Sequence, residues 1–470
     1  MAVTKFSSGS SFKNLVKYND FLAGNDAKQD YWMASLTDTA NATASQTANL
    51  RGVAVDSDGN VYSAGRWTSS GWGVGTITKH NSSGTLLWQR ALKTANNFGV
   101  FMGGIALDSS NNVYVAGSYN NSSNTFQIAH ITKYNTSGTI QWQRSISNPS
   151  TGTGVTSIAT DSSSNVYVTG TFINASNGTN AFIAKYNTSG TIQWQRSLAD
   201  SNSAAFQQDF PYCITTDSSG NVYVSGYQKG ASTFITKYDT SGTIQWQRVL
   251  SVTSYTSYGG YGIDTDSSGN VYITGNYYDA SVSSYSIFTA KYNTGGTLQW
   301  ERILRNNEAS APQAYGLACS VDSSGNVYVT GNFLNASNMS NAFIAKYNTS
   351  GTIQFQRRLR DNNATASQND YGNAITVSPN GIIYCVGYFR NSSNGTNAFI
   401  TKLPTDGTKT GTYTITSGQV LVYATLSLTT ANGSQTDSAN NMTDATASLT
   451  DAAGTNVDSA NTLTAAVVTI

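Results

Sequence analysis

The sequence at residues 217–226 reads DSSGNVYVSG, and it is followed at residues 234–248 by FITKYDTSGTIQWQR. Both runs recur along most of the chain. The aspartate that opens the first run stands at Asp56, Asp108, Asp161, Asp217, Asp266 and Asp322, with gaps of 52, 53, 56, 49 and 56 residues. A degenerate copy begins at Ser378, so the sequence contains seven copies. A repeat of this length indicates an array of one supersecondary unit.

Each copy predicts four short strands. The first is the apolar run before the aspartate, such as residues 104–107, and the second is the Asn-Val-Tyr-Val segment. The third contains Phe-Ile-x-Lys-Tyr and the fourth contains Thr-Ile-Gln-Trp-Gln-Arg. These runs are β-branched and aromatic and are bounded by Gly, Asn, Asp and Ser, which is typical of strands joined by tight turns. The chain is therefore predicted to be all-β.

Four-stranded units of this length, repeated seven times, are typical of a β-propeller. The repeated phrase resembles the SBBP-type bacterial propeller repeat and, more distantly, the NHL type, over about residues 31–403. The resemblance implies a seven-bladed β-propeller in which the first strand of each blade is innermost and the Trp-bearing strand is outermost. It implies no single activity, because the family has none.

The ends of the repeat array predict how the ring closes. The last copy stops at Pro404 without its Trp strand, whereas Trp32 lies upstream of the first copy. Residues 31–36 are therefore predicted to supply the outer strand of the seventh blade, within a propeller domain of residues 31–410. Residues 15–19 imitate a third strand, which leaves an eight-bladed ring as an alternative.

The outer strands contribute one large aromatic residue per blade, and we expect these residues to form the blade core because burial of a large ring contributes most to stability. They are Trp32, Trp88, Trp142, Trp194, Trp246, Trp300 and Phe355. The recurrent Lys of the third strand and Arg of the fourth are interpreted as framework groups that bond turns or cover the Trp rings.

Composition excludes several classes of function. Lys and Arg number 26 and Asp and Glu 25, a net charge of +1, so the attraction to phosphate that drives nucleic-acid binding is absent. No stretch approaches the length of a membrane span, and the first residues do not form a signal peptide. We expect synthesis in a cytoplasm without a signal peptide, and three buried reduced cysteines.

The sequence offers no catalytic or metal-binding pattern, so we expect no enzyme activity, no cofactor and no metal. His80 and His130 look like packing variants of repeat positions. Glu occurs only at residues 301 and 308, and Asp264 is the one unusual carboxylate on an inner strand. Asp56-Ser57-Asp58-Gly59-Asn60 resembles the start of a calcium loop but lacks its closing Glu, so a hairpin turn is favoured.

Loops of irregular length are expected on one rim of the ring, between second and third strands and between consecutive blades. Aromatic residues among amides and hydroxyls suit sugars or a protein partner, although they could equally pin long loops. The candidate binding residues are Trp67, Trp72, Tyr119, Phe206, Phe210, Tyr255, Tyr258, Tyr277, Tyr278 and Tyr285.

The two ends of the chain differ from the repeat. Residues 1–30 are interpreted as an N-terminal arm or anchor, and residues 411–470 are rich in Thr, Ala, Ser and Asn. In the second segment Asp437, Asp444, Asp451 and Asp458 stand seven residues apart. A heptad helix is conceivable, but weak helix formers and few apolar residues favour extended β or assembly-dependent structure.

These features favour a non-enzymatic surface protein of a bacteriophage particle, on capsid or tail. Residues 12–25 are similar to the openings of structural proteins from marine tailed phages. The expected partners are other virion proteins, held through either terminal segment, and a host-surface glycan, with a homo-oligomer left open. No nucleic acid and no membrane insertion are expected. The alternative is an exported bacterial propeller that binds carbohydrate or protein at the cell surface.

Overall fold

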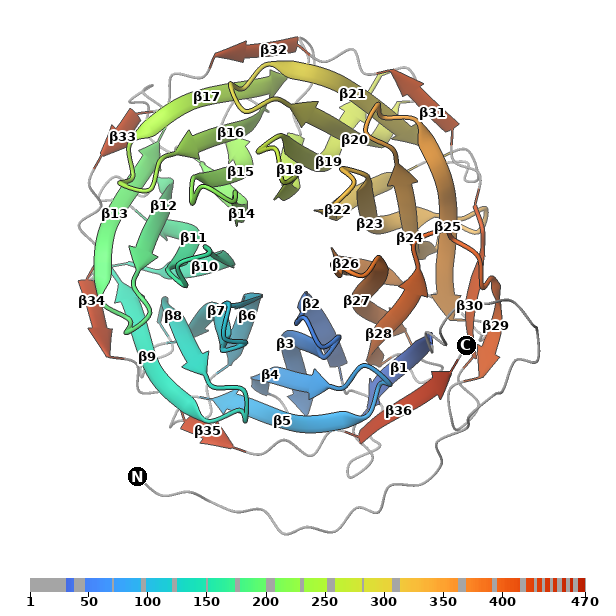
Figure 1. Cartoon of the computed structure of the whole chain (residues 1–470), viewed down its shortest axis with the longest axis horizontal. Helices are drawn as coiled ribbons and strands as arrows, with labels where there is room; N and C mark the ends of the chain where they lie inside the picture. The colour runs from blue at the N-terminus through green and yellow to red at the C-terminus, as the bar shows by residue number, and fades with distance from the viewer. Residues whose placement is uncertain are drawn as a thin grey trace.

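The computed structural model is all-β in the part of the chain that it describes, which contains strands and no helix, as the sequence predicts. Figure 1 shows the strands arranged around a central axis. The described residues are 31–37, 47–69, 72–93, 99–120, 125–148, 151–173, 178–199, 208–228, 232–251, 258–280, 283–306, 313–361, 369–390, 395–414, 420–426, 429–432, 436–439, 443–445, 450–453, 457–459 and 464–469. The predicted N-terminal arm and the strand-like residues 15–19 lie outside them.

Every repeat forms antiparallel strands in chain order, from the centre outward. The innermost strands are β2 (Thr47–Val55), β6 (Val100–Leu107), β10 (Thr153–Thr160), β14 (Phe210–Thr216), β18 (Tyr258–Thr265), β22 (Ala314–Val321) and β26 (Tyr371–Val377). The second strands are β3 (Val61–Ser69), β7 (Val113–Asn120), β11 (Val166–Ile173), β15 (Val222–Gln228), β19 (Val271–Asp279), β23 (Val327–Leu334) and β27 (Ile382–Arg390).

The third strands are β4 (Trp72–His80), β8 (Gln127–Tyr134), β12 (Thr179–Tyr186), β16 (Ser232–Tyr238), β20 (Ser284–Tyr292), β24 (Ser340–Tyr347) and β28 (Thr396–Pro404). The fourth strands, which carry Trp or, in β25, Phe355, are β5 (Leu86–Lys93), β9 (Ile140–Ser147), β13 (Ile192–Ala199), β17 (Ile244–Ser251), β21 (Leu298–Arg305) and β25 (Ile353–Asp361). Four-stranded sets of this kind are consistent with a β-propeller.

Hydrogen bonding joins the described strands into six sheets, because one sheet of ten strands contains both the first and the last repeat. A single parallel pair, Thr47 with Thr396, links those two repeats. Strand β1 (Trp32–Thr37) pairs antiparallel with β28, with Trp32 opposite Lys402 and Ala34 opposite Ile400. Residues 32–37 thus lie beside the last repeat, at the place where the other repeats have their Trp strand (Figure 1).

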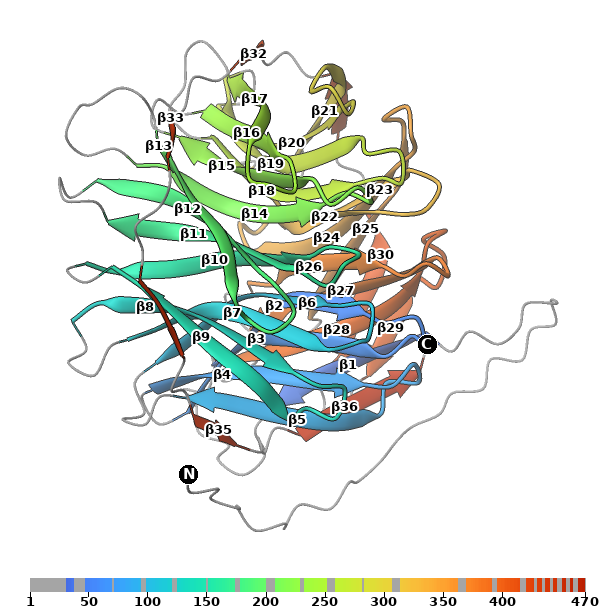
Figure 2. The same cartoon turned by 60° about the vertical axis from the view of Figure 1, so that its left-hand side comes forward.

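The chain after residue 410 is extended, as favoured from its composition, and not helical where it is described. Its strands are β29 (Gly411–Thr414), β30 (Val420–Thr425), β31 (Thr429–Asn432), β32 (Thr436–Ala439), β33 (Thr443–Ala445), β34 (Thr450–Ala453), β35 (Val457–Ser459) and β36 (Thr464–Thr469). From β30 onward each pairs with the outermost strand of one repeat. Figure 2 shows β33 and β35 on the outer surface.

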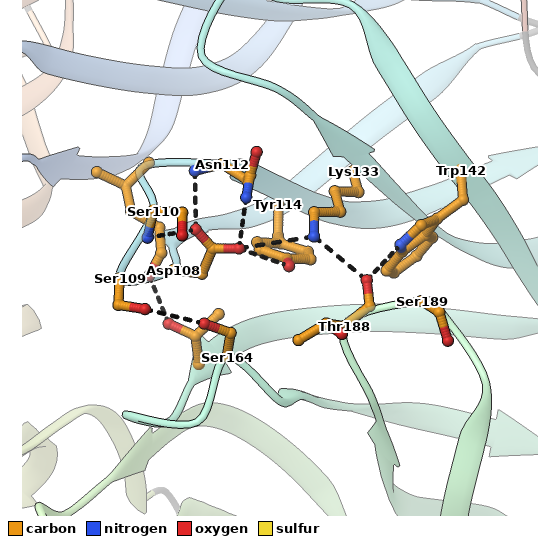
Figure 3. Close-up of polar contacts among 12 residues, drawn as sticks. Asp108, Ser109, Ser110, Asn112, Tyr114, Lys133, Trp142, Ser164, Thr188 and Ser189 are labelled. Atoms are coloured by element: carbon orange, nitrogen blue, oxygen red, sulfur yellow. Dashed lines mark hydrogen bonds and ion pairs between the residues drawn. The ribbon is translucent and has the colours of Figure 1, made fainter.

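The repeated aspartate organises the turn between the first two strands (Figure 3). The Asp108 carboxylate accepts hydrogen bonds from the backbone N–H groups of Ser110 at 3.0 Å and Asn112 at 2.9 Å. It also accepts from the Asn112 amide at 2.8 Å and the Tyr114 hydroxyl at 2.9 Å. Asp56 holds its turn in the same way, through Asn60 and Tyr62. The calcium-like run is therefore a hairpin turn, as predicted.

Side chains of the outer strands tie each repeat to the turn of the next repeat. The Trp142 indole donates to the carbonyl oxygen of Thr188 at 3.0 Å, and Lys133 donates to the same oxygen at 3.2 Å (Figure 3). The Arg144 guanidinium lies 5.8 Å from the Trp142 ring. These contacts confirm the interpretation of the recurrent Lys and Arg as framework groups.

The first and last repeats make the same kind of contact. The Trp32 indole donates to the carbonyl oxygen of Ser82 at 3.0 Å, and Lys402 donates to that oxygen at 2.9 Å. On the innermost strands, the Asn373 amide donates to the carbonyl oxygen of Leu50 at 2.7 Å. The last repeat, which consists of β26, β27 and β28 together with β1, therefore contacts the first repeat, which starts at β2, in the way that other neighbouring repeats contact each other.

The outer-strand aromatics are less buried than the sequence suggests. Trp32, Trp300 and Phe355 are buried, but Trp88, Trp142, Trp194 and Trp246 are only partly buried. All of these rings except Trp32 lie against the glycine of the next repeat's turn, including the buried Trp300 and Phe355. An added Cβ at Gly242, for example, would lie 2.9 Å from the Trp194 ring.

Tyrosines of the second and third strands fill the space between the sheets instead. Most of the largest fully buried side chains are these tyrosines, and Trp32 completes the set. The tyrosines are Tyr62, Tyr114, Tyr134, Tyr167, Tyr186, Tyr223, Tyr238, Tyr272, Tyr292, Tyr328 and Tyr347. A second-strand tyrosine reaches the turn aspartate of its own repeat with its hydroxyl, so its burial also satisfies a polar group.

Candidate functional site

The predicted aromatic residues of the irregular rim have different environments. Phe206 and Tyr255 lie outside the described residues, and for Trp72 and Tyr258 the structure gives only their backbone positions in β4 and β18. The described remainder must be sorted by burial and contact, because an aromatic side chain that packs into the blade has no face left for a ligand.

Three of these predicted residues belong to the framework. Tyr277 is 4% exposed, and its hydroxyl donates to Asp279 at 3.0 Å. Asp279 also pairs with Arg305 at 2.6 Å, so Tyr277 is part of a buried polar cluster and not of a binding surface. Trp67 and Tyr119 are partly buried and pack against the apolar clusters of the first repeats.

The innermost strands present a different set of side chains, through a bulge near the start of each strand. The pairing of first and second strands shifts by one residue in all seven repeats, for example between Pro211 and Cys213 and between Gly260 and Gly262. A bulge re-aims the extra residue. The extra residues are Arg51, Gly103, Thr156, Tyr212, Tyr261, Leu317 and Asn373.

The bulged residues reach the next innermost strand around the ring. The Thr156 hydroxyl donates to the carbonyl oxygen of Pro211 at 2.7 Å, and the Tyr212 ring stacks on Tyr261 with centroids 4.5 Å apart. A glycine of the second strand makes room for each bulge. At Gly226, an added Cβ would lie 2.0 Å from the carbonyl oxygen of Phe210.

Aromatic rings continue from Tyr212 and Tyr261 along the later repeats. We call Phe210, Tyr212, Tyr261, Tyr285, Tyr315, Tyr371 and Tyr388 the aromatic arc. Tyr285 stacks on Tyr315 with centroids 5.4 Å apart, and Tyr371 stacks on Tyr388 at 4.9 Å. Burial and the neighbouring phenols of Tyr285, Tyr371 and Tyr261 raise the pKa of Tyr315 to about 12. Ring contacts join Phe210 to Tyr212, Tyr212 to Tyr261, Tyr285 to Tyr315 and Tyr371 to Tyr388, so the arc consists of three stacked groups.

Two predicted binding residues belong to this arc and one flanks it. Phe210 stacks on Tyr212, Tyr285 stacks on Tyr315, and Tyr278 packs edge-on against Tyr285. Tyr212, Tyr261, Tyr315, Tyr371 and Tyr388 were not among the predicted residues, because the candidates were chosen from the irregular loops expected between the strands. The available signal was an aromatic residue at or near the irregular start of the inner strand in successive repeats.

A cavity of about 220 Å³ opens at the last repeat, beside the stacked pair Tyr371 and Tyr388. Its other lining residues are Asn369, Arg390 and Thr396. Burial and Tyr371 raise the pKa of Tyr388, whereas the positive charge of Arg51 acts in the opposite direction. The cavity thus combines two aromatic rings with an amide, a hydroxyl and one guanidinium group, which can stack on a ring and hydrogen-bond its substituents.

Asp264 is a buried carboxyl on an innermost strand. It accepts hydrogen bonds from the backbone N–H groups of Val321 at 2.8 Å and Thr265 at 2.9 Å. Burial outweighs these bonds and raises its pKa to about 6. Because its backbone partners belong to two neighbouring innermost strands, Asp264 links repeats rather than facing another carboxylate as an acid/base pair would.

We expect Asp264 to make stability depend on pH. Its folded pKa of about 6 lies above the unfolded value of about 3.9, so the folded state holds the proton more tightly. This contribution is fully present below about pH 4 and is lost as the pH rises to about 6. Denaturant unfolding of Asp264→Asn and the unsubstituted protein across this range should show a stability difference that changes with pH. A constant difference would contradict the assignment.

Other groups with catalytic or metal-binding chemistry are separated from the arc or buried. His80 and His130 are buried in the sheets, and burial lowers the pKa of each to about 4. The free cysteines Cys319 and Cys385 are buried, and Cys213 is partly buried. Among the described residues, no group of three or more His, Cys, Asp or Glu side chains is placed to hold a metal ion. Within the same residues, no helix has the length and apolar character to cross a membrane.

The sequence matches the family described as outer membrane protein assembly factor BamB, over residues 26–259 and 127–388. These two overlapping matches cover more than half of the chain. The chain belongs to the BamB-like repeat family. Membership in the BamB-like family supports a β-propeller repeat, as predicted, but not the SBBP or NHL type in particular. None of the curated proteins matches the chain.

Solved structures resemble the BamB-like chain at low identity. The polysaccharide lyase Uly1 is 10% identical, with a TM-score of 0.46, over 76% of this chain and 90% of that chain. A protein of unknown function from Dyadobacter fermentans DSM 18053 is 10% identical, with a TM-score of 0.43, over 66% and 96%. A glucose dehydrogenase is 8% identical, with a TM-score of 0.37, over 76% and 98%. These likenesses are too distant to indicate an activity.

Proposed function

We propose that this protein is a non-enzymatic propeller that binds carbohydrate at the aromatic arc and displays that surface on a bacteriophage particle. The observation that carries the binding proposal is the cavity beside the stacked rings of Tyr371 and Tyr388. Sugars present C–H faces that pack on aromatic rings and hydroxyl groups that need polar partners, and the cavity supplies both.

The chemistry of the cavity favours an acidic sugar. Arg390 lines it together with Tyr371 and Tyr388. A guanidinium group binds a carboxylate in a planar, bidentate geometry, so a uronic or sialic acid is a better match than a neutral sugar. The aromatic residues of the arc lie on strands, and stacking on a neighbouring ring holds their side chains in place. Binding therefore costs less side-chain conformational entropy.

We also infer a seven-bladed ring that β1 closes. The support is the repetition of the same contacts between neighbouring repeats, including Trp32 with Ser82 and Asn373 with Leu50. In this arrangement the loops on the side of the aromatic arc form one face, and the Asp-centred turns form the other.

The absence of catalysis in this proposal is supported by the placement of ionisable groups. His80 and His130 pack in the sheets, and the backbone N–H groups around Asp264 occupy its carboxylate oxygens. These groups therefore serve the fold, whereas Tyr371 and Tyr388 of the arc line a cavity together with Asn369, Arg390 and Thr396.

Display on a phage particle is supported by the uncharged polar composition and by the resemblance of residues 12–25 to structural proteins of marine tailed phages. The alternative is an exported bacterial propeller with the same binding face, and the name of the matched family, an assembly factor of outer membrane proteins, favours partner binding in that setting. Mass spectrometry of purified virions should detect the protein. Its recovery from the cell envelope or culture supernatant, and not from virions, would reject the phage assignment.

We expect the double variant Tyr371→Ala/Tyr388→Ala to weaken glycan binding at least about tenfold, because truncation of a packed aromatic contact costs more than about 1 kcal/mol. The measurement is a glycan array followed by titration of the strongest acidic glycan. Arg390→Ala should reduce the preference for acidic over neutral glycans.

Leu87→Ala is the matched control, because Leu87 is 50% exposed and follows a turn on the opposite face. Its binding should be unchanged. Equal binding by the double variant, with an unchanged melting curve, would remove the aromatic arc as the binding surface.

A further inference from the structure

The strands after residue 420 recur with a period of seven residues. We call β30 to β36 the C-terminal belt. The strands β31 to β36 begin at residues 429, 436, 443, 450, 457 and 464. The four aspartates at residues 437, 444, 451 and 458 follow the same interval, each as the second residue of its strand. The seven-residue period, which resembles a helical heptad in the sequence, is therefore the interval at which a new strand begins.

The pairing register of the belt repeats with the same interval. One belt residue in every seven lies opposite the leucine, or in one case isoleucine, near the end of an outer strand. The pairs are Tyr423 with Leu359, Thr430 with Leu304, Asp437 with Leu250, Asp444 with Leu198, Asp451 with Ile146, Asp458 with Leu92 and Ala465 with Leu36. Seven residues of belt thus correspond to one repeat of about 50 residues.

The belt visits the repeats in reverse chain order. Strands β30 to β35 pair with β25, β21, β17, β13, β9 and β5 in turn, and β36 pairs with β1 (Figure 1). Seven extended residues reach at most about 23 to 25 Å, which is the greatest distance that can separate one pairing from the next. The belt therefore reaches every outer edge of the ring in one circuit.

We propose that the outermost strand of each repeat is a binding edge for an extended peptide, and that the C-terminal belt of the same chain is its ligand, with one seven-residue unit bound by each repeat. An outer strand without the belt has a row of unpaired N–H and C=O groups, which is the kind of edge that accepts an added strand. The paired backbone groups supply the affinity.

The repeated unit supplies the register. A one-residue slip in a strand turns all of its side chains to the opposite face, and a slip of a whole unit leaves one outer edge uncovered. The consensus of four units, Thr or Val followed by Asp and then Ala or Ser, is the same at β32, β33, β34 and β35. The units are similar to one another, and so are the outer strands that they pair with. The seven-residue spacing therefore determines which unit pairs with which outer strand.

Disulfide trapping in the full-length chain tests both the register and the occupant. Ser147 lies opposite Thr450, and the residue one unit earlier is Thr443. Directly opposed strand residues have Cα atoms within the range of a disulfide. After mild oxidation, Ser147→Cys/Thr450→Cys should form an intramolecular disulfide at least about tenfold more completely than Ser147→Cys/Thr443→Cys, because only the matched thiols are held side by side.

A second pair of cysteine variants, placed on another repeat, controls for a local structural effect of the first substitutions. Ser197→Cys/Ala445→Cys is matched, and Ser197→Cys/Ala452→Cys is shifted by one unit. Peptide mapping without reduction identifies the linked residues, and electrophoresis separates monomers from dimers. Selective linkage within monomers in both matched pairs supports the proposal. Equal linkage of matched and shifted pairs, or no linkage, would overturn the register, and linkage between two chains would overturn the same-chain occupant.

Discussion

Gly226→Ala is expected to prevent stable folding of the repeat that contains it. An added Cβ would lie 2.0 Å from the carbonyl oxygen of Phe210 and 2.7 Å from the Cα of Pro211. Both are backbone atoms of the neighbouring strand, so the overlap cannot be relieved by rotating a side chain. Because the same backbone forms the bulge that aims Tyr212, we expect a loss of about 4 kcal/mol or more in the free energy of unfolding, together with loss of the arc's geometry.

The check is denaturant unfolding followed by intrinsic fluorescence, with Gly295→Ala as the matched control. Gly295 is exposed, and an added Cβ would have its nearest neighbour 3.5 Å away, at the Asn293 side chain. The control should be within about 1 kcal/mol of the unsubstituted protein. A similar stability for both variants would contradict the bulge geometry.

Asp217→Ala should cause the second largest loss, about 3 to 5 kcal/mol in the free energy of unfolding. The carboxylate accepts hydrogen bonds from the backbone N–H groups of Ser219 and Asn221, both at 2.9 Å. It also accepts from the Asn221 amide and the Tyr223 hydroxyl, both at 2.8 Å. Removal of the acceptor leaves the buried Tyr223 hydroxyl without this partner, and an unsatisfied buried donor carries its full desolvation cost.

Asp58→Ala is the control, because Asp58 stands in the corresponding turn of the first repeat with an exposed side chain. Thermal unfolding followed by circular dichroism should separate the two variants clearly. If Asp217→Ala melted together with the control, the turn network would not contribute as the distances indicate.

The local structure of the repeats was predictable because each signal is local. The Asp-Ser-Ser-Gly-Asn run determines its own turn, in which Gly220 has φ of +78°, and the β-branched runs on either side become strands. The pairing of residues 32–37 with the last repeat was also accessible, because Trp32 stands alone before the first turn and the last copy lacks its Trp strand.

The aromatic arc was not predictable in the same way. A bulge depends on two strands at once, so the orientation of Tyr212 follows from Gly226 and not from its own neighbours in sequence. For the same reason the Trp positions were expected to be more buried than they are. Their hydrophobicity is evident in the sequence, but the glycine turn that receives Trp194 belongs to the next repeat.

The seven-residue spacing of the C-terminal segment was visible in the sequence. Its structural meaning became clear only when each seven-residue unit was found to pair with one repeat. A period of seven fits both a helix seam and a strand that recurs once per repeat. The weak helix propensity of Ser, Thr and Asn argued for the extended form, and the pairing partners of β30 to β36 lie up to several hundred residues away in sequence.

The position of β1 between β28 and β36 has a consequence for biosynthesis. Among the described strands β1 is translated first, whereas β28 and β36 are translated several hundred residues later. The outer strands β5, β9, β13, β17 and β21 are likewise translated before the belt strands that pair with them, so their edges are unpaired in the meantime. During this interval unpaired edges expose nascent chains to misassembly with one another, and pairing between strands so far apart in sequence is expected to be slow.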